Sequence, residues 1–377
     1  MIIPITKPYI TGDEEKEVVK VLRSGWLAQG PRTEKLEKMF SGLVGSKYAV
    51  AFNSCTSALH TALLLSGVGP GDEVIVPSFS FIATANSVLH TGATPVFVDI
   101  DERTYNIAPE KIEKAITKRT KVIMPVHQLG LPADMDTILK TAGKHNLKVI
   151  EDAACAIGSE YKGRKIGSIS GISCFSFHPR KVITTGEGGM LTTGSKSASD
   201  KAKIIRSHGA SISDLARHSA KKVLFEKYTV LGYNYRISDL EAAVGIMQLK
   251  KLPHILERRR KLAERYSGIL GKIDCLEVPY VPGYAKPNFQ SYIVRLKKNS
   301  PKTQKQVIQE MQKKGIATRP GVMAIHLEPL YRKKYEGISL PVTEECSRST
   351  ILLPLFPQMS EKEQVYVIEN LEEVLKK

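Results

Sequence analysis

The sequence predicts an α/β protein with a mainly parallel central sheet flanked by helices, followed by a smaller C-terminal α/β domain. Three observations carry this prediction. Short apolar, β-branched runs alternate with helical patterns from about residue 50 to residue 191. A long helix-forming segment follows, and a second unit of strands and helices closes the chain. Strands that alternate with helices are typical of a parallel sheet covered on both faces.

The first half of the chain supplies the elements of this sheet. Its strand-like runs are Val74–Val76, Pro95–Val98, Val122–Pro125, Val149–Ile150 and Ile172–Phe177. The helical patterns that lie between several of them include Thr56–Leu65, Ile82–Leu89 and Met135–His145. Ligands of such sheets bind beyond the carboxyl ends of the strands, so the residues that follow the runs are the candidates for a site.

The second half of the chain has a different pattern of predicted elements. The segment Ile237–Ile269 predicts one long helix, or two, with a basic outer face. The later predicted elements are a strand at Ser291–Leu296, a helix at Lys302–Lys314 and a closing helix from about Glu361 to Leu375. We expect the domain boundary near residue 250, with a large cofactor domain in residues 1–250 and a small domain in residues 251–377.

The chain of 377 residues has a formal net charge of +17 and a pI near 9.5. This charge is consistent with a nucleic-acid partner, with a polyanionic substrate, or with a surface property that has no functional meaning. The five cysteines form no CxxC pair, and His127, His178 and His326 are far apart, so neither a disulfide framework nor a metal site is expected. No signal peptide or membrane span is recognisable, so we expect a cytoplasmic protein.

A hydroxyl-rich segment, NSCTSAL, lies where an apolar run meets a predicted helix. Thr56 and Ser57 stand at the start of that helix, where free N–H groups and the helix dipole favour a phosphate group. Ordinary helix capping explains the same residue types.

The acidic pair Glu151 and Asp152 directly follows the strand-like residues Lys148–Ile150. An acid at the carboxyl end of a parallel strand is well placed to contact a ligand. A cap for the next helix is an equally good interpretation.

Lys181 follows the apolar run Ile172–Phe177 and precedes the Gly-rich segment GEGG. Most lysines lie at the surface. A lysine that is partly desolvated and near other cations can have a lowered pKa, however, and can then act as an amine nucleophile. The glycines would let the backbone approach a flat cofactor closely.

Together these segments predict a site for pyridoxal 5'-phosphate (PLP). The cofactor needs a place for its phosphate, an acid that keeps its pyridine nitrogen protonated and an amine that holds its aldehyde. Thr56, Asp152 and Lys181 supply these groups in that order along the chain. The pyridinium would in turn favour the ionised form of Asp152.

The same segments resemble the DegT/StrS-type sugar aminotransferases, which have the aspartate aminotransferase fold (fold type I). The resemblance runs nearly from end to end, and its motifs include VVKVLRSGWLAQGPRTEKLEKMF, NSCTSALHTAL, VIVPSFSFIATAN, EDAACAIGS, SFHPRKVITTGEGG and YTVLGYNYRISDLEAAVGIMQL. It implies a homodimer with shared active sites.

The resemblance implies roles for individual residues. Lys181 would hold the cofactor covalently and move a proton, and Asp152 would pair with the pyridine nitrogen. Phe81 would stack on the cofactor ring. The phosphate would be held by Thr56, Ser57 and Ser176 and, from the neighbouring subunit, by Asn234.

Three further residues are weaker candidates for contact with the substrate: His326, Tyr233 and Arg236. Cys155 is a departure, because its position commonly carries His or Gln in the family, in contact with the cofactor's ring hydroxyl. Cysteine is a weak donor, so we expect this contact to be altered without loss of catalysis. A related dehydratase branch has His in place of the lysine, and Lys181 therefore predicts transamination.

The implied function is that of a PLP-dependent aminotransferase in the EC 2.6.1 class. It would take an amino group from an amino acid, with L-glutamate as the expected donor, and hold it as pyridoxamine 5'-phosphate (PMP). The acceptor would be a keto-deoxysugar nucleotide, and the amino sugar would serve polysaccharide, glycan or secondary-metabolite biosynthesis.

Two alternatives to this function stay open. One is a PLP-dependent aminotransferase that acts on a non-nucleotide cyclic ketone. The other, from a different class, is a basic regulatory or nucleic-acid-binding protein on the same scaffold. Its support is the +17 charge alone, since no nucleic-acid-binding motif accompanies it.

Overall fold

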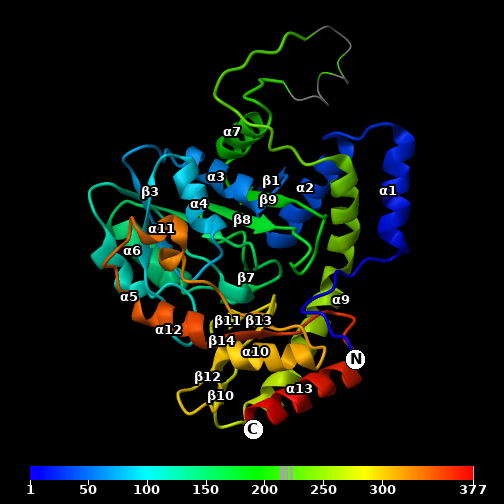
Figure 1. The fold of residues 1–377 in the computed structure, drawn as a ribbon. Helices are drawn as coiled ribbons and strands as arrows, with labels where there is room; N and C mark the ends of the chain where they lie inside the picture. The colour runs from blue at the N-terminus through cyan, green and yellow to red at the C-terminus, as the bar shows by residue number, and fades with distance from the viewer. Residues whose placement is uncertain (213–216, 218–219, 221–223, 377) are drawn as a thin grey trace.

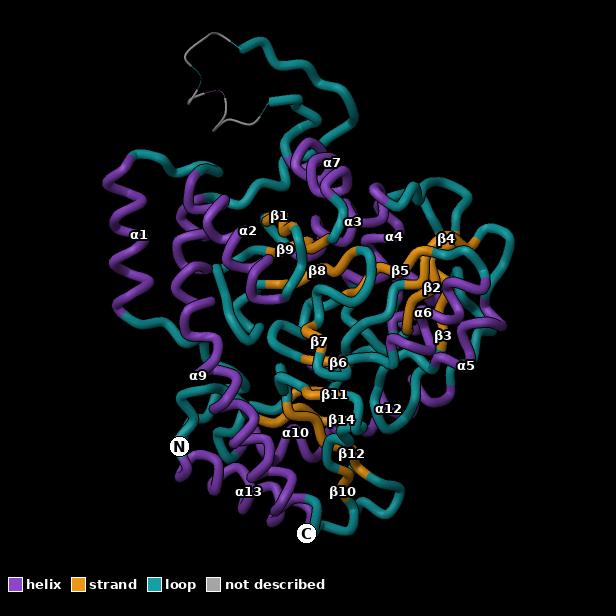
Figure 2. The backbone as a smooth tube through the Cα atoms, turned by 180° about the vertical axis from the view of Figure 1, so that it is seen from behind, coloured by secondary structure: helices purple, strands orange, loops and turns teal. Residues whose placement is uncertain are grey.

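The structure, a computed structural model, describes residues 1–212, 217, 220 and 224–376. Figure 1 shows a large body that contains the central sheet and a smaller body at the foot of the view, where both ends of the chain lie. The long helix α9 (Asp239–Leu270) runs between the two bodies. Figure 2 shows the same arrangement from behind.

The central sheet has, within the described residues, seven strands in the order β1-β9-β8-β5-β4-β2-β3. They are β1 (Tyr48–Phe52), β2 (Glu73–Pro77), β3 (Thr94–Val98), β4 (Thr120–Ile123), β5 (Lys148–Asp152), β8 (Ile172–Ser176) and β9 (Gly189–Thr193). All neighbouring pairs are parallel except those of β9, which is antiparallel to both β1 and β8. The prediction of a mainly parallel sheet is confirmed. The sequence does not predict β9, because its GMLTT segment follows directly on the Gly-rich turn.

Helices cover both faces of the sheet. The core on one face contains residues of α3 (Cys55–Leu65), α4 (Ala83–His90) and α7 (Lys196–Arg206). The core on the other face contains residues of α2 (Pro31–Val44), α6 (Met135–Lys144) and the first half of α9. Val74 and Val76 of β2 belong to the first core and Ile75 to the second, as the alternation of side chains along a strand requires.

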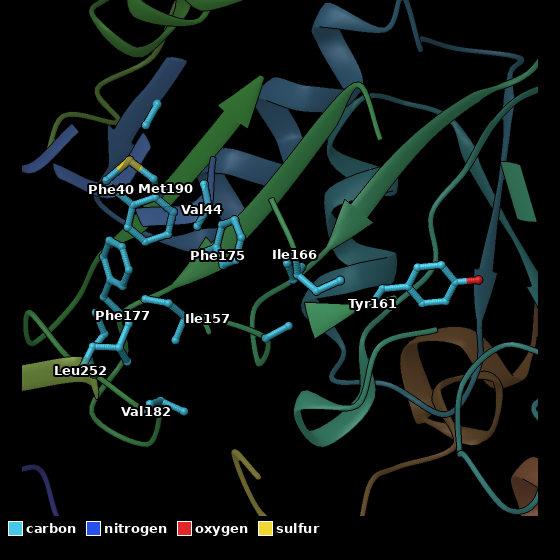
Figure 3. Packing of buried hydrophobic residues seen from close by; sticks show 14 of the residues in the cluster. Phe40, Val44, Ile157, Tyr161, Ile166, Phe175, Phe177, Val182, Met190 and Leu252 are labelled. Carbon is cyan, nitrogen blue, oxygen red and sulfur yellow. The ribbon is translucent and has the colours of Figure 1, made fainter. Parts of the chain in front are cut away.

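Figure 3 shows part of the second core, where side chains of α2, β8 and the residues that follow β8 meet. The rings of Phe175 and Phe177 lie edge-on to that of Phe40, with centroids 5.0 and 5.6 Å away. Each such buried side chain stabilises the fold by about 1.5–3 kcal/mol. This packing anchors β8 and the chain directly after it, which leads to Lys181.

The smaller body is built on an antiparallel sheet with the order β10-β12-β14-β13. Its strands are β10 (Leu276–Glu277), β12 (Tyr292–Leu296), β13 (Arg319–Pro320) and β14 (Thr350–Leu353), and its helices include α10 (Gln304–Lys313) and α13 (Glu361–Lys376). The predicted strand at Ser291–Leu296 and the two predicted helices that follow it are confirmed within one or two residues at each end.

The remaining elements are short or peripheral. A small sheet joins β6 (Glu160–Tyr161), β7 (Arg164–Lys165) and β11 (Ala285–Lys286). Further α-helices of the described residues are α1 (Gly12–Ser24), α5 (Pro109–Ile112), α11 (Pro329–Arg332) and α12 (Pro341–Ser349). None of the helices in the described ranges is long and apolar enough to cross a membrane.

The segment Ile237–Ile269 forms one continuous helix, α9, rather than two. Ser238 and Glu241 close its N-terminus with a capping box, and Pro253 lies inside it without ending it. Residues up to Leu256 pack in a core of the large body, and residues from Leu262 pack in the core of the small body. The predicted boundary near residue 250 therefore lies within a helix that both cores share, and the division into residues 1–250 and 251–377 stays a prediction.

Candidate active site

Three segments that the sequence singles out meet at one edge of the central sheet. Asp152 ends β5, and Ser176 ends the neighbouring parallel strand β8. Ser176 is paired with Gly189 of β9, which is paired with Phe52 at the end of β1. Since α3 begins directly after β1, its N-terminus lies at the same edge.

Gly189 allows β9 to lie directly against the first turn of α3. A Cβ atom at this position would lie 2.4 Å from the carbonyl carbon and oxygen of Ser54 and 2.5 Å from the nitrogen of Cys55. Such distances are impossible for a side chain, so only glycine fits. The close approach brings the N–H groups of the helix start to the end of β8.

The N-terminus of α3 is capped by Ser54, whose Oγ accepts a hydrogen bond of 3.1 Å from the N–H of Ser57. The hydroxyl of Ser57 donates to Asn53 Oδ1 at 2.7 Å. The capping interpretation of this segment is thus confirmed for Ser54. Thr56 is half-buried in the same first turn.

Asp152 is a buried carboxylate held by two donors. Its Oδ2 accepts from the hydroxyl of Thr84 at 2.7 Å, and its Oδ1 accepts from the N–H of Ala154 at 3.1 Å. Burial raises the pKa of Asp152, while these hydrogen bonds and the charge of Lys181 act in the opposite direction and offset part of the rise. The carboxylate is therefore fixed in orientation, and its pKa is lowered by a cation beside it.

Thr84 lies on α4 and was not singled out in the sequence. It also shares a hydrogen bond of 2.8 Å with the hydroxyl of Ser80, so a short relay leads from α4 to Asp152. The signal that could have found it is a hydroxyl residue in the first turn of a helix that follows the end of a central strand.

Lys181 contacts Cys155 across the edge, with Nζ 3.2 Å from Sγ. Burial favours the neutral amine, but interactions with Cys155 and Asp152 favour the ammonium ion, and the result is a raised pKa of Lys181. The expectation of a lowered pKa is therefore wrong for this protein. The neighbours that were expected to be cations are a sulfur atom and a carboxylate.

Phe81 lies two residues before the start of α4 and is 65% exposed, which is unusual for a phenylalanine. Its carbonyl oxygen accepts from the N–H of Thr84 at 3.1 Å. The exposed ring thus belongs to the turn that also supplies the hydroxyl bound to Asp152.

Asn234 reaches the same edge through its main chain. Its carbonyl oxygen accepts from Asn53 Nδ2 at 3.3 Å, while the residue itself is exposed. Tyr233 stacks on Tyr235 with ring centroids 4.8 Å apart, and Arg236 is half-buried beside them.

His326 is only 1% exposed. Its Nδ1 shares a hydrogen bond of 2.7 Å with the hydroxyl of Ser78, directly after β2, and its Nε2 lies 3.5 Å from Glu344 Oε1. Burial lowers the pKa of His326, although Glu344 opposes the change. A contact between this ring and a substrate stays a prediction, because the ring is buried against protein groups.

Two amides from the small body fasten the loops that carry Cys155 and Lys181. Asn288 Nδ2 donates to the carbonyl oxygens of Cys155 and Ile157 at 2.7 and 2.8 Å. Gln290 Nε2 donates to the carbonyl oxygen of Arg180 at 2.6 Å. The sequence gives little sign of either role, because the amides come from a Pro-containing stretch far along the chain.

These residues fit PLP on structural grounds. The start of α3 offers N–H groups and hydroxyls to a phosphate, and the glycine at position 189 leaves room for them to converge with the end of β8. Asp152 is a buried acid with fixed orientation, Lys181 is an amine within the same cluster, and Phe81 presents a free aromatic ring.

The sequence matches the DegT/DnrJ/EryC1/StrS aminotransferase family over residues 8–372. The chain belongs to this family. The spore coat polysaccharide biosynthesis protein SpsC of Bacillus subtilis is similar to this family member, with 40% identity over 378 residues that cover 99% of the chain and 97% of SpsC.

Solved structures agree with this assignment. The putative sugar aminotransferase Spr1654 of Streptococcus pneumoniae, in its PMP-form, matches with a TM-score of 0.93 and 32% identity over 99% of each chain. PseC of Helicobacter pylori, an aminotransferase involved in pseudoaminic acid biosynthesis, matches with a TM-score of 0.93 and 29% identity over 100% of each chain. Spr1654 is also known in a PLP-form. This DegT/DnrJ/EryC1/StrS family protein is a PLP-dependent aminotransferase with the α/β fold of its relatives.

Proposed function

We propose that the protein transfers an amino group from L-glutamate to the keto group of a nucleotide-linked deoxysugar in the cytoplasm. The amino sugar would enter polysaccharide, glycan or secondary-metabolite biosynthesis. The observation that carries the proposal is the cluster of Lys181 and Asp152 at the sheet edge where α3 begins. The names of SpsC and PseC, which refer to polysaccharide and pseudoaminic acid biosynthesis, support a sugar as the acceptor.

The geometry of the edge supports the proposed cofactor contacts. Thr56 and Ser57 at the start of α3, with Ser176 at the end of β8, hold the phosphate. Phe81 covers one face of the cofactor ring with its exposed side chain. When bound, PLP supplies a carbonyl carbon that accepts the amine and a ring that withdraws electrons.

Asp152 faces the pyridine nitrogen in this proposal. A buried carboxylate beside a pyridinium is stabilised in its ionised form, which offsets the rise in pKa that burial causes. Thr84 and the N–H of Ala154 keep the carboxylate aimed in one direction. The carboxylate would thereby favour the protonated form of the ring nitrogen of bound PLP.

Lys181 holds the cofactor between turnovers and moves the proton during them. Its amine would accept a proton from the α carbon of the donor and would act as the general acid that returns it, with bound PLP supplying the electron-withdrawing ring. The loop that carries Lys181 is fixed by Gln290 and by the hydrogen bond from its own N–H to the carbonyl oxygen of His178, at 2.8 Å. Fixed loops keep the amine within reach of both carbon atoms.

A homodimer completes the site in this proposal. Several large apolar side chains near Asn234 are exposed, namely Phe225, Tyr228, Val230 and Leu231, with Phe225 and Leu231 exposed by 86% and 81%. An exposed apolar segment of this kind marks a protein–protein contact. A second copy of the chain is the occupant that would bring the Asn234 side chain to the phosphate of its neighbour.

The excess of positive charge supports an anionic acceptor. A field generated by a net charge of +17 attracts the diphosphate of a nucleotide sugar and raises its rate of encounter. Salt weakens such fields, so kcat/KM for the nucleotide sugar is expected to fall as ionic strength rises.

A screen of 3-keto and 4-keto nucleotide sugars with L-glutamate tests the proposal. Formation of an amino sugar with at least one of them is the expected result, and the Lys181→Ala variant should give none. The matched control is the same sugar without its nucleotide, which should react with a much lower kcat/KM. Turnover of cyclic ketones or free sugars in preference to every nucleotide sugar would contradict the proposed acceptor.

A further inference from the structure

Cys155 and Lys181 are two nucleophiles in direct contact. The sulfur and nitrogen atoms lie 3.2 Å apart, a distance at which rotation of the flexible lysine chain is enough to bring them to bonding distance. Lys181 is the amine to which the cofactor attaches in the proposed function, so any bond at this nitrogen affects cofactor binding.

Cys155 differs from the other cysteines in its exposure. All five lie in the described ranges, and Cys55, Cys174, Cys275 and Cys346 are buried whereas Cys155 is only partly so. Cys346 offers an internal comparison, because its sulfur lies 4.0 Å from Nη1 of Arg295. Both cysteines have a cationic neighbour, but Cys155 alone combines a cation with access for a small oxidant.

The main chain on both sides of the pair is held in place. Asn288 binds the carbonyl oxygen of Cys155, and Gln290 binds that of Arg180, directly before Lys181. Both amides belong to one short segment, which Arg259 fixes through hydrogen bonds of 3.1 Å to the carbonyl oxygens of Phe289 and Gln290. The main chain therefore keeps Cys155 and Lys181 side by side, while the lysine side chain itself can still rotate.

We propose that Cys155 and Lys181 form a reversible oxidative cross-link, an S–N bond made in the presence of a hydroperoxide when the cofactor is absent from Lys181. The sulfur of Cys155 first attacks the distal oxygen of the hydroperoxide. The O–O bond breaks, the sulfur is oxidised to a sulfenic acid, and the hydroperoxide is reduced to an alcohol, or to water in the case of hydrogen peroxide.

The amine of Lys181 then attacks the sulfur of the sulfenic acid. An S–N bond forms, the S–O bond breaks, and the hydroxyl group leaves with a proton of the amine as water. This second step is a condensation with no change in overall oxidation level. A low-molecular-weight thiol reverses it, because a thiolate attacks the sulfur, the S–N bond breaks and the amine regains a proton. A second thiol then releases Cys155 from the mixed disulfide and is itself converted to a disulfide.

The charges around Lys181 favour this order of steps. The sulfur of Cys155 contributes to the raised pKa of Lys181, and burial of the amine acts against it. Oxidation of the sulfur to a neutral sulfenic acid weakens the interaction with Cys155 that favours the ammonium ion of Lys181. Burial then favours the neutral amine, which is the form that attacks sulfur.

Peptide mapping by mass spectrometry tests the cross-link directly. The full-length protein is freed of cofactor, treated with hydrogen peroxide and digested, and a parallel sample keeps its PLP. The expected result is a joined pair of peptides that contain Cys155 and Lys181, lighter than their sum by two hydrogen atoms. Dithiothreitol should separate the joined peptides in the digest. Added to the undigested protein, it should restore the capacity to bind PLP.

Three variants locate the bond. Cys155→Ser should give no joined peptides. Lys181→Arg retains a positive charge without the amine, and should leave Cys155 as a sulfenic acid that dimedone labels. Cys55→Ser is the matched control, because Cys55 interacts electrostatically with both Cys155 and Lys181 but is buried. In this variant the bond between Cys155 and Lys181 should form as in the wild type.

Two results would overturn the proposal. One is a disulfide between Cys155 and Cys55, which has the same mass change but disappears in Cys55→Ser. The other is oxidation of Cys155 with Lys181 unmodified in the wild type. The cofactor-loaded sample separates this inference from the proposed function on which it rests. If PLP does not prevent the cross-link, Lys181 is not the attachment point of PLP, and the oxidative bond still stands.

Discussion

The two sides of the candidate site are built in different ways. On the inner side, Asp152, Lys181 and Cys155 are held by hydrogen bonds from groups of the same chain, including Thr84 and Asn288. On the outer side, Phe81 and Asn234 are exposed, and so are Phe225 and Leu231, which precede Asn234 in the chain.

The difference indicates that the two sides have different functions. The inner side is finished by the fold of one chain, so its chemistry depends on local charges and orientation. The outer side ends in exposed apolar surface, which favours completion by a second copy. Changes on the inner side should therefore affect the chemical step, and changes on the outer side should affect assembly and retention of the cofactor.

The largest effect is expected for Lys181→Arg on the inner side. The variant keeps a cation in place but has no amine that can hold the cofactor or move a proton at neutral pH. We expect turnover to fall by at least about 10⁴-fold, because both covalent and general acid–base catalysis are lost. Steady-state kinetics with saturating PLP measure the fall in turnover, and circular dichroism checks that the fold is retained. Turnover within tenfold of the wild type would show that the inner side is not the catalytic one.

Subunit complementation gives the next largest effect and tests the outer side. Lys181→Arg and Asn234→Asp are each expected to be inactive, the second because a carboxylate repels the cofactor phosphate. In an equal mixture, half of the dimers are mixed, and each has one of its two sites intact. Activity should therefore recover to about a quarter of the wild-type value.

Two differently tagged chains show whether mixed dimers form. If they form without any recovery of activity, Asn234 does not serve the neighbouring site. That outcome would fit the main-chain contact of Asn234 with Asn53 of its own chain.

Thr84→Val should have a moderate effect, because it removes the hydroxyl bound to Asp152 while it preserves the shape of the side chain. A hydrogen bond to a charged group contributes about 1.5–3 kcal/mol, so kcat/KM should fall by about 10- to 100-fold. This hydrogen bond lowers the pKa of Asp152, and its loss should move the acidic limb of the pH profile to higher pH.

Ser87→Ala is the matched control for Thr84→Val. Ser87 lies on the same helix and donates to the carbonyl oxygen of Thr84, with no contact to the carboxylate. Its pH profile should be that of the wild type. An unchanged acidic limb in Thr84→Val would mean that Thr84 only stabilises the fold.

The smallest effect concerns protein stability and involves His60 of α3, which contacts Tyr235, the residue after Asn234. His60 shares a hydrogen bond of 3.0 Å with the hydroxyl of Tyr235, and burial lowers the pKa of His60 to about 4. The unfolded chain therefore binds this proton more readily, so stability is lost as the pH falls below about 6.5. Between pH 7 and pH 5 the loss from His60 should be about 1–2 kcal/mol.

His60→Gln should reduce that loss, as measured by urea unfolding at both pH values. Between pH 7.5 and 8.5, where no histidine with this pKa titrates, the two proteins should change in parallel. An equal loss of stability at pH 5 in both would assign the acid sensitivity to other groups.

Much of the inner side follows from the sequence because its parts lie at strand ends. Asp152, Ser176 and the start of α3 are each adjacent in sequence to an apolar run, and parallel strands bring their ends to one edge. Thr84, Asn288 and Gln290 could not be found in this way, because their contacts depend on packing between distant segments.

The raised pKa of Lys181 cannot be predicted from the sequence for the same reason. Its direction depends on which groups surround the amine, and the nearest one, Cys155, comes from a different loop. The strand β9 was missed because a short polar-ended segment after a Gly-rich turn has little pattern of its own. Local patterns thus predict strand ends, whereas side-chain neighbours require the fold.

A half-reaction with L-glutamate tests the central claim most directly. The PLP-loaded protein is mixed with L-glutamate in the absence of any keto sugar, and the absorption of the bound cofactor is followed. We predict that PLP is converted to PMP with release of one 2-oxoglutarate per site, and that a keto nucleotide sugar then restores the PLP spectrum and takes up the amine. A PLP spectrum that no amino acid donor changes would contradict the account.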